Sequence, residues 1–167
     1  MTEGFLLDTS VASAAWDVRH RSHAEISRWL EGIGEAPVWV SPISLGELEY
    51  GIALMTEAGD AADLMRAAMR EYMRAELDHH VAETYGRLRG RLFNRFAPKN
   101  LRGLPKKKRP EDLRDLATSK QLGIQENDLW IVSTAVTRRL TLVSTDAMPH
   151  LLEVARDEFG WEDLNHV

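Results

Sequence analysis

The feature that most constrains the fold is a short apolar run near the N-terminus that ends abruptly at an acid. Residues 5–7 (Phe-Leu-Leu) are followed by Asp8 and then by Thr9 and Ser10. An uninterrupted apolar run indicates a parallel-type strand that is covered on both faces. Ligands of open α/β sheets bind just beyond the carboxyl ends of such strands. Asp8 therefore lies where a functional side chain is expected, and a plain helix-capping role is the alternative.

Three more acids follow elements of the same kind. Residues 140–143 (Leu-Thr-Leu-Val) form a second apolar strand that runs through two hydroxyl residues into Asp146. Glu47 lies in the first two turns of a helix that begins soon after the short strand at residues 38–40, and Asp128 lies in the first turn of a largely apolar helix. In a parallel α/β sheet, these four positions fall on one edge. We therefore expect the four carboxylates to lie together.

The other elements follow from apolar spacing and from helix start and stop signals. Helices are predicted at residues 11–16 (capped by Thr9 or Ser10), 22–33, 42–52, 60–77, 81–96, 111–121 and 150–159. A further helix, with Asn127 or Asp128 as its N-cap, runs to residue 136, and a last strand is predicted at 161–164. The two long helices at 60–77 and 81–96 are expected to form an antiparallel pair that leaves an amphipathic surface for self-association. Strands that alternate with helices predict an α/β fold, and 167 residues fit a single domain.

A basic loop interrupts this pattern at residues 97–110, which contain three prolines and a glycine. Its basic residues are Lys99, Arg102, Lys106, Lys107, Lys108 and Arg109. The net charge of the chain is −5, which argues against binding nucleic acid over the whole surface, but a local basic cluster can still hold a phosphate backbone. We interpret the loop as an insertion, and its residues Lys106, Lys107, Lys108 and Arg109 either contact the phosphates of a substrate or are simply solvated.

Several classes of protein are disfavoured by composition. The chain has no cysteine, which excludes disulfides, thiolate zinc sites and a cysteine nucleophile. No apolar run approaches the roughly 18 residues needed to span a bilayer, and the acidic N-terminus is unlike a secretory signal. We therefore expect a cytoplasmic protein without membrane contact.

Four clustered carboxylates repel one another, and either protonation or a bound cation relieves this repulsion. A site made only of oxygen ligands suits Mg²⁺ or Mn²⁺ rather than zinc. Metals held in this way activate water and stabilise the charge that develops during displacement at phosphorus. The alternative is four unrelated helix caps and surface acids.

Four segments resemble the signature blocks of PIN-domain ribonucleases, and most closely those of VapC-type toxins from type II toxin–antitoxin pairs. They are Leu6-Leu7-Asp8-Thr9-Ser10, Ser44-Leu45-Gly46-Glu47-Leu48-Glu49-Tyr50-Gly51, Asn127-Asp128-Leu129-Trp130-Ile131-Val132 and Leu142-Val143-Ser144-Thr145-Asp146. The resemblance spans nearly the whole chain. It implies a central parallel sheet with helices on both faces, an Mg²⁺- or Mn²⁺-dependent endoribonuclease, a homodimer and inhibition by a VapB-like antitoxin.

The resemblance also assigns the site. Asp8, Glu47, Asp128 and Asp146 match the acidic residues of the family, and Thr9 and Ser144 match its hydroxyl positions. Our role assignments are hypotheses: Asp8 and Asp128 bind the metal directly, and Glu47 and Asp146 bind it or hold the attacking water, with Asp146 counted among the metal-binding residues. Alanine at Asp8 is expected to abolish cleavage while leaving the fold intact.

Other functions remain open at this point. A haloacid-dehalogenase-like phosphatase needs a second aspartate two residues after Asp8, where the chain has Ser10. A receiver domain needs paired acids before its phosphorylated aspartate, and this chain lacks them. A PIN nuclease of RNA maturation without an antitoxin, and a PIN scaffold that binds RNA or protein without cutting, are the two remaining alternatives.

Overall fold

The structure, a computed structural model, describes residues 3–55 and 59–165. At its centre lies a five-stranded sheet in the order β3-β2-β1-β4-β5, in which every neighbouring pair is parallel. The strands are β1 (Phe5–Leu7), β2 (Val38–Val40), β3 (Met73–Arg74), β4 (Thr141–Ser144) and β5 (Gly160–Asp163). The predicted α/β fold with a central parallel sheet is confirmed.

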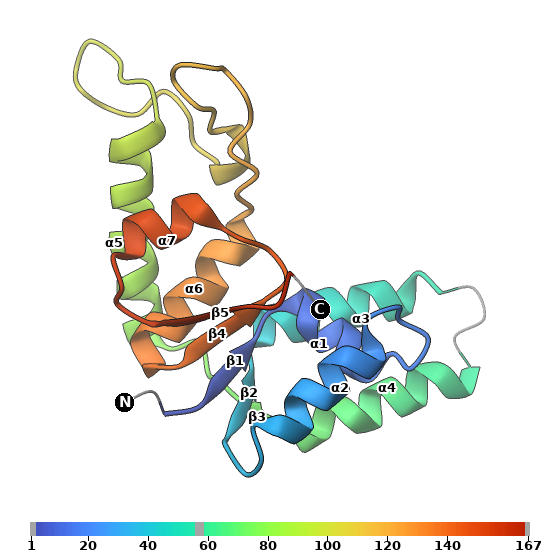
Figure 1. Cartoon of the computed structure of the whole chain (residues 1–167). Helices are drawn as coiled ribbons and strands as arrows, with labels where there is room; N and C mark the ends of the chain where they lie inside the picture. The colour runs from blue at the N-terminus through green and yellow to red at the C-terminus, as the bar shows by residue number, and fades with distance from the viewer. Residues whose placement is uncertain (1–2, 56–58, 166–167) are drawn as a thin grey trace.

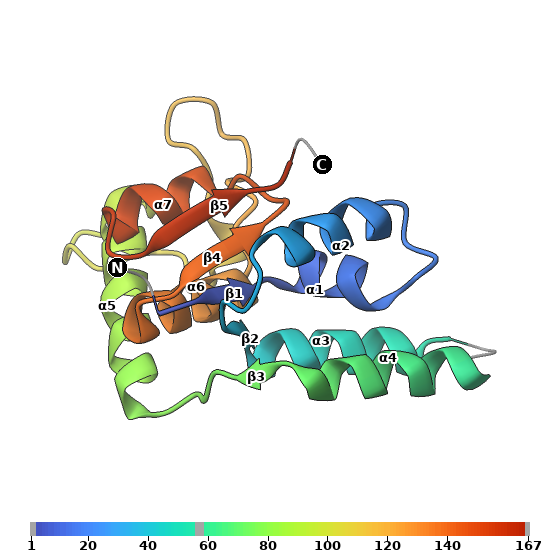
Figure 2. The ribbon, with the colours of Figure 1, turned by 60° about the horizontal axis from the view of Figure 1, so that its bottom comes forward.

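Helices cover both faces of the sheet (Figures 1 and 2). They are α1 (Thr9–Trp16), α2 (His23–Gly32), α3 (Pro42–Ala53), α4 (Gly59–Glu71), α5 (His79–Phe96), α6 (Glu126–Arg138) and α7 (Pro149–Ala155). Successive strand residues point to opposite faces. Leu6 and Leu142 accordingly belong to a core with α5, α6 and α7, and Leu7 and Val143 to a core with residues of α1 to α4.

The order of the strands creates a crevice at the middle of the sheet. The chain begins at β1, adds β2 and β3 on one side, and then returns across the sheet to place β4 and β5 on the other side. Ligands of such sheets bind at the carboxyl ends of the strands, where the winding direction reverses. That point lies between β1 and β4, where Leu7 pairs with Val143 and the Asp8 N–H donates to the Val143 carbonyl at 3.0 Å.

Local sequence fixes the helices that leave this edge. Ser41 caps α3 by accepting the Ser44 N–H at 3.0 Å, and Pro42 suits the first helical position. Asp8 itself caps α1, because its Oδ1 accepts the Val11 N–H at 2.9 Å. The prediction that Thr9 or Ser10 caps this helix was therefore wrong. Capping holds the Asp8 side chain at the strand end.

The predicted helix at residues 111–121 is absent from the structure, which has only a 3₁₀ turn at Pro110–Asp112 there. The chain instead folds back on itself: Arg114 bridges Gln121 in antiparallel fashion, and the Asp115 N–H donates to the Lys120 carbonyl at 2.8 Å. Asp115 also accepts the Ala117 and Thr118 N–H groups. Aspartate side chains compete with helix in this way by bonding to nearby backbone.

Three helix boundaries also differ from the prediction. The helix predicted to reach residue 77 ends at Glu71, because the residues beyond it form β3 against β2. The helix predicted to reach residue 159 ends at Ala155, where Arg156 takes a left-handed conformation. α6 begins at Glu126 with Gln125 as its N-cap, so Asn127 and Asp128 lie inside the first turn.

The two long helices, α4 and α5, do not form the predicted antiparallel pair. Buried residues of α4 belong to the core on one face of the sheet, and those of α5 belong to the core on the other. Beyond α5, residues 97–109 form a loop that projects past the end of the helix (Figure 1). Within the described ranges, no helix combines the length and apolar character needed to cross a membrane.

Candidate functional site

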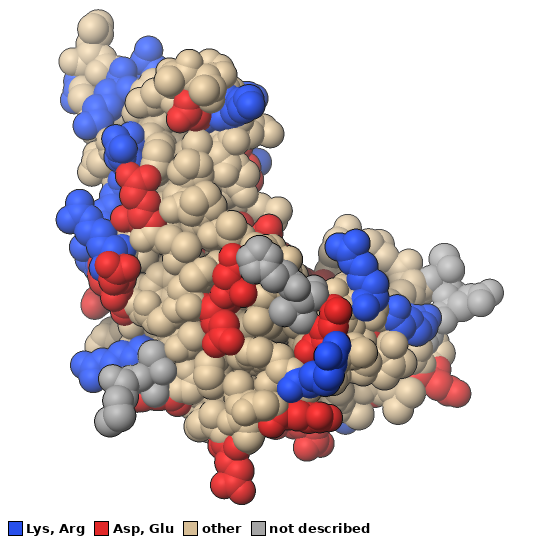
Figure 3. Space-filling model, in the orientation of Figure 1, with Lys and Arg blue, Asp and Glu red and all other residues tan. Residues whose placement is uncertain are grey.

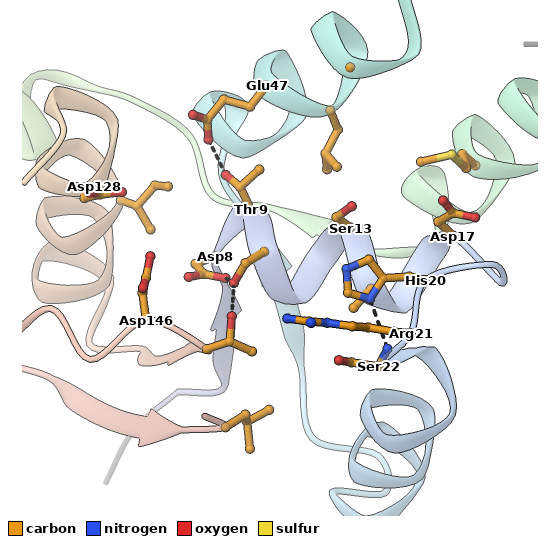
Figure 4. Close-up of a pocket in the computed structure, with 18 of the residues that line it drawn as sticks. Asp8, Thr9, Ser13, Asp17, His20, Arg21, Ser22, Glu47, Asp128 and Asp146 are labelled. Atoms are coloured by element: carbon orange, nitrogen blue, oxygen red, sulfur yellow. Dashed lines mark hydrogen bonds between the residues drawn. The ribbon is translucent and has the colours of Figure 1, made fainter. Parts of the chain in front are cut away.

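A pocket with a volume of about 750 Å³ opens at the carboxyl edge of the sheet. All four predicted carboxylates line it: Asp8, Glu47, Asp128 and Asp146. They come from four elements, namely the end of β1, the first turns of α3, the first turn of α6 and the segment after β4 (Figure 4). Residues up to 138 positions apart in the sequence thus meet because the carboxyl ends of parallel strands share one edge.

Asp8 is the most enclosed of the four, with a relative exposure of 4%. Both of its oxygens are engaged: Oδ2 accepts the Ser144 hydroxyl, and Oδ1 accepts the Ser10 hydroxyl at 2.8 Å and the Val11 N–H. Burial raises the pKa of Asp8, the nearby charge of Asp146 adds to this, and the three hydrogen bonds oppose it. Asp8 is thus held in one orientation at a position where a charged carboxylate is disfavoured unless a cation is near.

Glu47 is oriented by residues from two other helices. Its Oε2 accepts the Thr9 hydroxyl from α1, and its Oε1 accepts the Asn127 side-chain amide from α6 at 2.8 Å. Asn127 was predicted only as a helix cap. Its contact with Glu47 depends on the packing of α3 against α6, and no local sequence pattern predicts this contact.

Asp128 and Asp146 are the other two carboxylates that line the pocket. Burial raises the pKa of Asp128 to about 6, the negative charges of Asp146, Asp8 and Glu47 add to this, and the Gln125 N–H opposes it. The pKa of Asp128 thus responds to all three other carboxylates. Asp146 is anchored through its backbone, since its N–H donates to the Ser144 hydroxyl oxygen at 2.9 Å.

The chemistry of these donors fits a hard divalent cation. Carboxylate and hydroxyl oxygens are the preferred ligands of Mg²⁺ and Mn²⁺, and positive charge would relieve the raised pKa values of Asp8 and Asp128. Within residues 3–55 and 59–165, no three acidic or histidine side chains stand close enough together to form a ready-made metal cage. The carboxylates are instead held by hydroxyl, amide and backbone N–H groups.

Ser144 links two of the acids, so its hydroxyl should control their geometry. It is fully buried, donates to Asp8 and accepts the Asp146 N–H. We expect Ser144→Ala to weaken Mg²⁺ or Mn²⁺ binding by roughly 10- to 100-fold, the usual effect of removing a group that orients a ligand. Isothermal titration with Mn²⁺ measures this.

The matched control is Ser133→Ala, which also removes a fully buried hydroxyl. Ser133 lies in α6 and donates to the Leu129 carbonyl at 2.6 Å, away from the acids. It should leave Mn²⁺ affinity unchanged. An equal loss of affinity in both variants would mean that Ser144→Ala weakens metal binding only by destabilising the folded protein.

The basic residues predicted to contact RNA lie elsewhere. Lys106, Lys107, Lys108 and Arg109 are not among the residues that line the acidic pocket. Lysine and arginine side chains gather over the far end of α5 and the loop beyond it, at the upper left of Figure 3. The loop is nevertheless tied to α6, because Arg89 contacts both the Lys108 carbonyl and, at 2.9 Å, Glu126.

Comparisons with known proteins place this geometry in a family. The family model described as "PIN domain" matches residues 5–156, which is most of the chain and includes all four carboxylates. The chain therefore belongs to the PIN-domain family, a family of nucleases that generally use divalent metals. No curated protein matches the chain.

Solved structures share the fold over nearly full length at low sequence identity. VapBC2 from Rickettsia felis, bound to a DNA fragment from its promoter, has a TM-score of 0.62 and 19% identity, covering 95% of this chain and 97% of that one. FitAcB from Neisseria gonorrhoeae has a TM-score of 0.62 and 19% identity, with 98% and 99% covered. VapBC-5 from Mycobacterium tuberculosis, of the VapBC family of toxin–antitoxin systems, has a TM-score of 0.53 and 16% identity, with 96% and 97% covered.

Proposed function

We propose that this chain is a divalent-metal-dependent endoribonuclease and the toxin of a toxin–antitoxin pair. The observation that carries the nuclease proposal is that Asp8, Glu47, Asp128 and Asp146 line one pocket at the point where the sheet reverses its winding. The reaction is hydrolysis of an RNA phosphodiester bond. A phosphatase of the dehalogenase type is disfavoured because Ser10, rather than a second aspartate, shares the strand end with Asp8.

In this proposal Asp8, Asp128 and Asp146 hold Mg²⁺ or Mn²⁺. When bound, such an ion stabilises the charge on the reacting phosphate and favours the ionisation of water. Through its two hydrogen bonds, Ser144 fixes the position of the Asp8 side chain relative to the backbone of Asp146. The raised pKa of Asp128 means that this carboxyl group is about half protonated near pH 6, and that it releases its proton fully only well above that pH or when a cation binds beside it.

Glu47 has a different role from the other three. The Thr9 hydroxyl and the Asn127 amide each donate to one of its oxygens, so the carboxylate plane is fixed from two sides. We assign Glu47 to hold the attacking water and accept its proton. A positioned carboxylate acting as a general base contributes roughly 10²- to 10⁴-fold to a rate.

The toxin part of the proposal rests on the solved structures with the same fold, which include VapBC toxin–antitoxin systems. A VapB-like antitoxin would inhibit the nuclease. We expect its inhibitory segment to carry an Arg or Lys that reaches the carboxylates, together with apolar anchors, since charge-assisted bonds to carboxylates are strong. We also propose that the chain acts as a homodimer.

The nuclease proposal is tested by incubating antitoxin-free protein with total cellular RNA in Mg²⁺, in Mn²⁺ and in EDTA. We expect discrete fragments with either metal and none with EDTA, because the carboxylates need the cation to hold and polarise the phosphate. The products also identify the RNA target. Cleavage that persists undiminished in EDTA contradicts the metal requirement, and no cleavage by folded protein favours a non-cutting scaffold.

The toxin proposal needs a separate experiment in cells. Induced expression should arrest growth, and co-expression of a VapB-like antitoxin, which we expect a short neighbouring gene for a DNA-binding protein to encode, should restore it. An Asp8→Asn variant should not arrest growth. Cleavage in vitro without growth arrest, or the lack of any such neighbour, would favour a PIN nuclease of RNA maturation instead.

A further inference from the structure

The segment that joins α1 to α2 lines the side of the pocket that faces the four carboxylates, and it contributes Asp17, His20 and Arg21 to the lining. Among the described residues that line the pocket, only His20 and Arg21 have side chains that can carry a positive charge. Figure 4 shows the Arg21 side chain reaching across the pocket toward Asp8, with His20 beside it. The two residues place positive charge and a ring N–H opposite a wall of carboxylates.

The hydrogen bonds of this segment favour Arg21 over its neighbour Arg19. Arg19 is paired with Asp17, whose Oδ1 accepts both the Arg19 N–H and Nε at 3.0 and 3.2 Å. Arg21 is exposed and, within the described residues, forms no salt bridge. Its charge is therefore available to an anion that enters the pocket.

His20 is held in a defined tautomer. The Ser22 N–H donates to His20 Nδ1 at 3.2 Å, so Nδ1 is the acceptor and the neutral ring carries its proton on Nε2. The same contact fixes the turn that carries Arg21. His20 thus offers a hydrogen-bond donor to the pocket next to the guanidinium group.

RNA needs such groups at a site made mainly of acids. The carboxylates repel every phosphate of the strand, and a cation beside them neutralises this only locally. Contacts to neighbouring phosphates fix the register and direction of a bound strand. Arginine suits this task because its planar fork binds two phosphate oxygens at once. A pocket of about 750 Å³ is much larger than the coordination sphere of one ion.

We propose that Arg21, supported by His20, binds a phosphate of the RNA strand adjacent to the one that is cleaved. This inference rests on the proposed nuclease function and adds the residue that positions the substrate across the acidic pocket. Arg21 then acts in strand binding, and the distant Lys106–Arg109 loop is not required for the contact that orders the strand at the carboxylates.

Binding is measured in an Asp8→Asn background, so that a fluorescently labelled single-stranded RNA oligonucleotide stays intact. Arg21→Ala should raise the Kd about tenfold or more and reduce the salt dependence of log Kd by about 0.7, the value for one lost phosphate contact on a single strand. Arg21→Lys should recover part of the affinity, since lysine keeps the positive charge but lacks the planar guanidinium group that binds two phosphate oxygens.

The matched control is Arg28→Ala, which removes an exposed arginine of α2 that does not line the pocket. It should bind and cleave RNA like the parent protein. In the wild-type background, Arg21→Ala should raise KM while kcat changes less, because the lost contact binds substrate without touching the reacting atoms. Equal melting temperatures for the variants exclude a folding defect.

The outcomes separate this inference from the proposed function. If the wild type cleaves RNA and Arg21→Ala matches Arg28→Ala in Kd, salt dependence and KM, the Arg21 inference is wrong and the nuclease stands. If the wild type neither binds nor cleaves RNA, the nuclease proposal fails and the inference fails with it.

Discussion

Asp8→Asn is expected to reduce RNA cleavage by at least roughly 10²- to 10³-fold while leaving the protein folded. The magnitude is that of removing one group that stabilises charge in a transition state. Asp8 combines two roles, because it caps α1 through Val11 and faces the other acids in the pocket. Asparagine keeps an oxygen to accept the Val11 N–H and removes the charge, and the amide group that replaces Oδ2 can donate to the Ser144 oxygen instead of accepting its hydroxyl.

The choice of substitution matters for this result. Asp8→Ala also deletes the helix cap, which costs about 1 kcal/mol of stability, so lost activity in that variant would mix two causes. Because burial raises the pKa of Asp8, the asparagine variant should not melt below the wild type in the absence of metal. Cleavage and thermal melting are measured on the same samples. An Asp8→Asn protein that cleaves at the wild-type rate refutes the assignment.

Asp128→Asn is expected to lose activity and yet to stabilise the metal-free protein at neutral pH. The folded pKa of Asp128 is about 6, above the value of 3.8 for the free side chain, so folding disfavours the charged form. The stability that protonation provides is fully present below about pH 4 and is lost as the pH rises through about 6. At pH 7 the charge costs on the order of 3 kcal/mol, since the pKa is raised by about two units and each unit corresponds to about 1.4 kcal/mol.

This prediction has a clear signature in chemical denaturation. The free energy of unfolding of metal-free wild type should fall between pH 4 and pH 7, and the Asp128→Asn variant should show less of this fall. Added Mg²⁺ should stabilise the wild type but not Asp128→Asn, because a ligand stabilises the state that binds it. Asp112→Asn, which changes an exposed acid outside the pocket, is the control. If Asp128→Asn is less stable than the wild type at pH 7, the charge of Asp128 does not destabilise the folded protein, and the prediction is wrong.

The sequence predicted the strands that carry the site because each combines an apolar run with a polar stop. The runs that end at Asp8 and at Asp146 coincide with β1 and β4, and the sheet is parallel as expected. A different outcome was found for β3, which is only two residues long. Its conformation depends on pairing with Trp39 and Val40, and the local sequence resembles the end of the preceding helix.

The partners of the acids were harder to predict than the acids themselves. Asn127 contacts Glu47 across 80 residues of sequence, and Ser144 contacts Asp8 across 136. Such pairs depend on how helices and strands pack, which apolar periodicity does not specify. Arg21 lies in a short turn without periodicity, so only the fold brings it to the pocket.

The central claim is that Asp8, Asp128 and Asp146 bind a divalent cation in the pocket that they share with Glu47, and Mn²⁺ binding followed by electron paramagnetic resonance tests it most directly. Free Mn²⁺ should lose its signal on addition of wild-type protein and keep it with a variant in which Asp8, Asp128 and Asp146 are all changed to Asn. Glu49→Gln, which alters an acid of the same helix as Glu47 that is paired with Arg66, should bind like the wild type. Equal Mn²⁺ binding by the wild type and the triple variant would contradict the account.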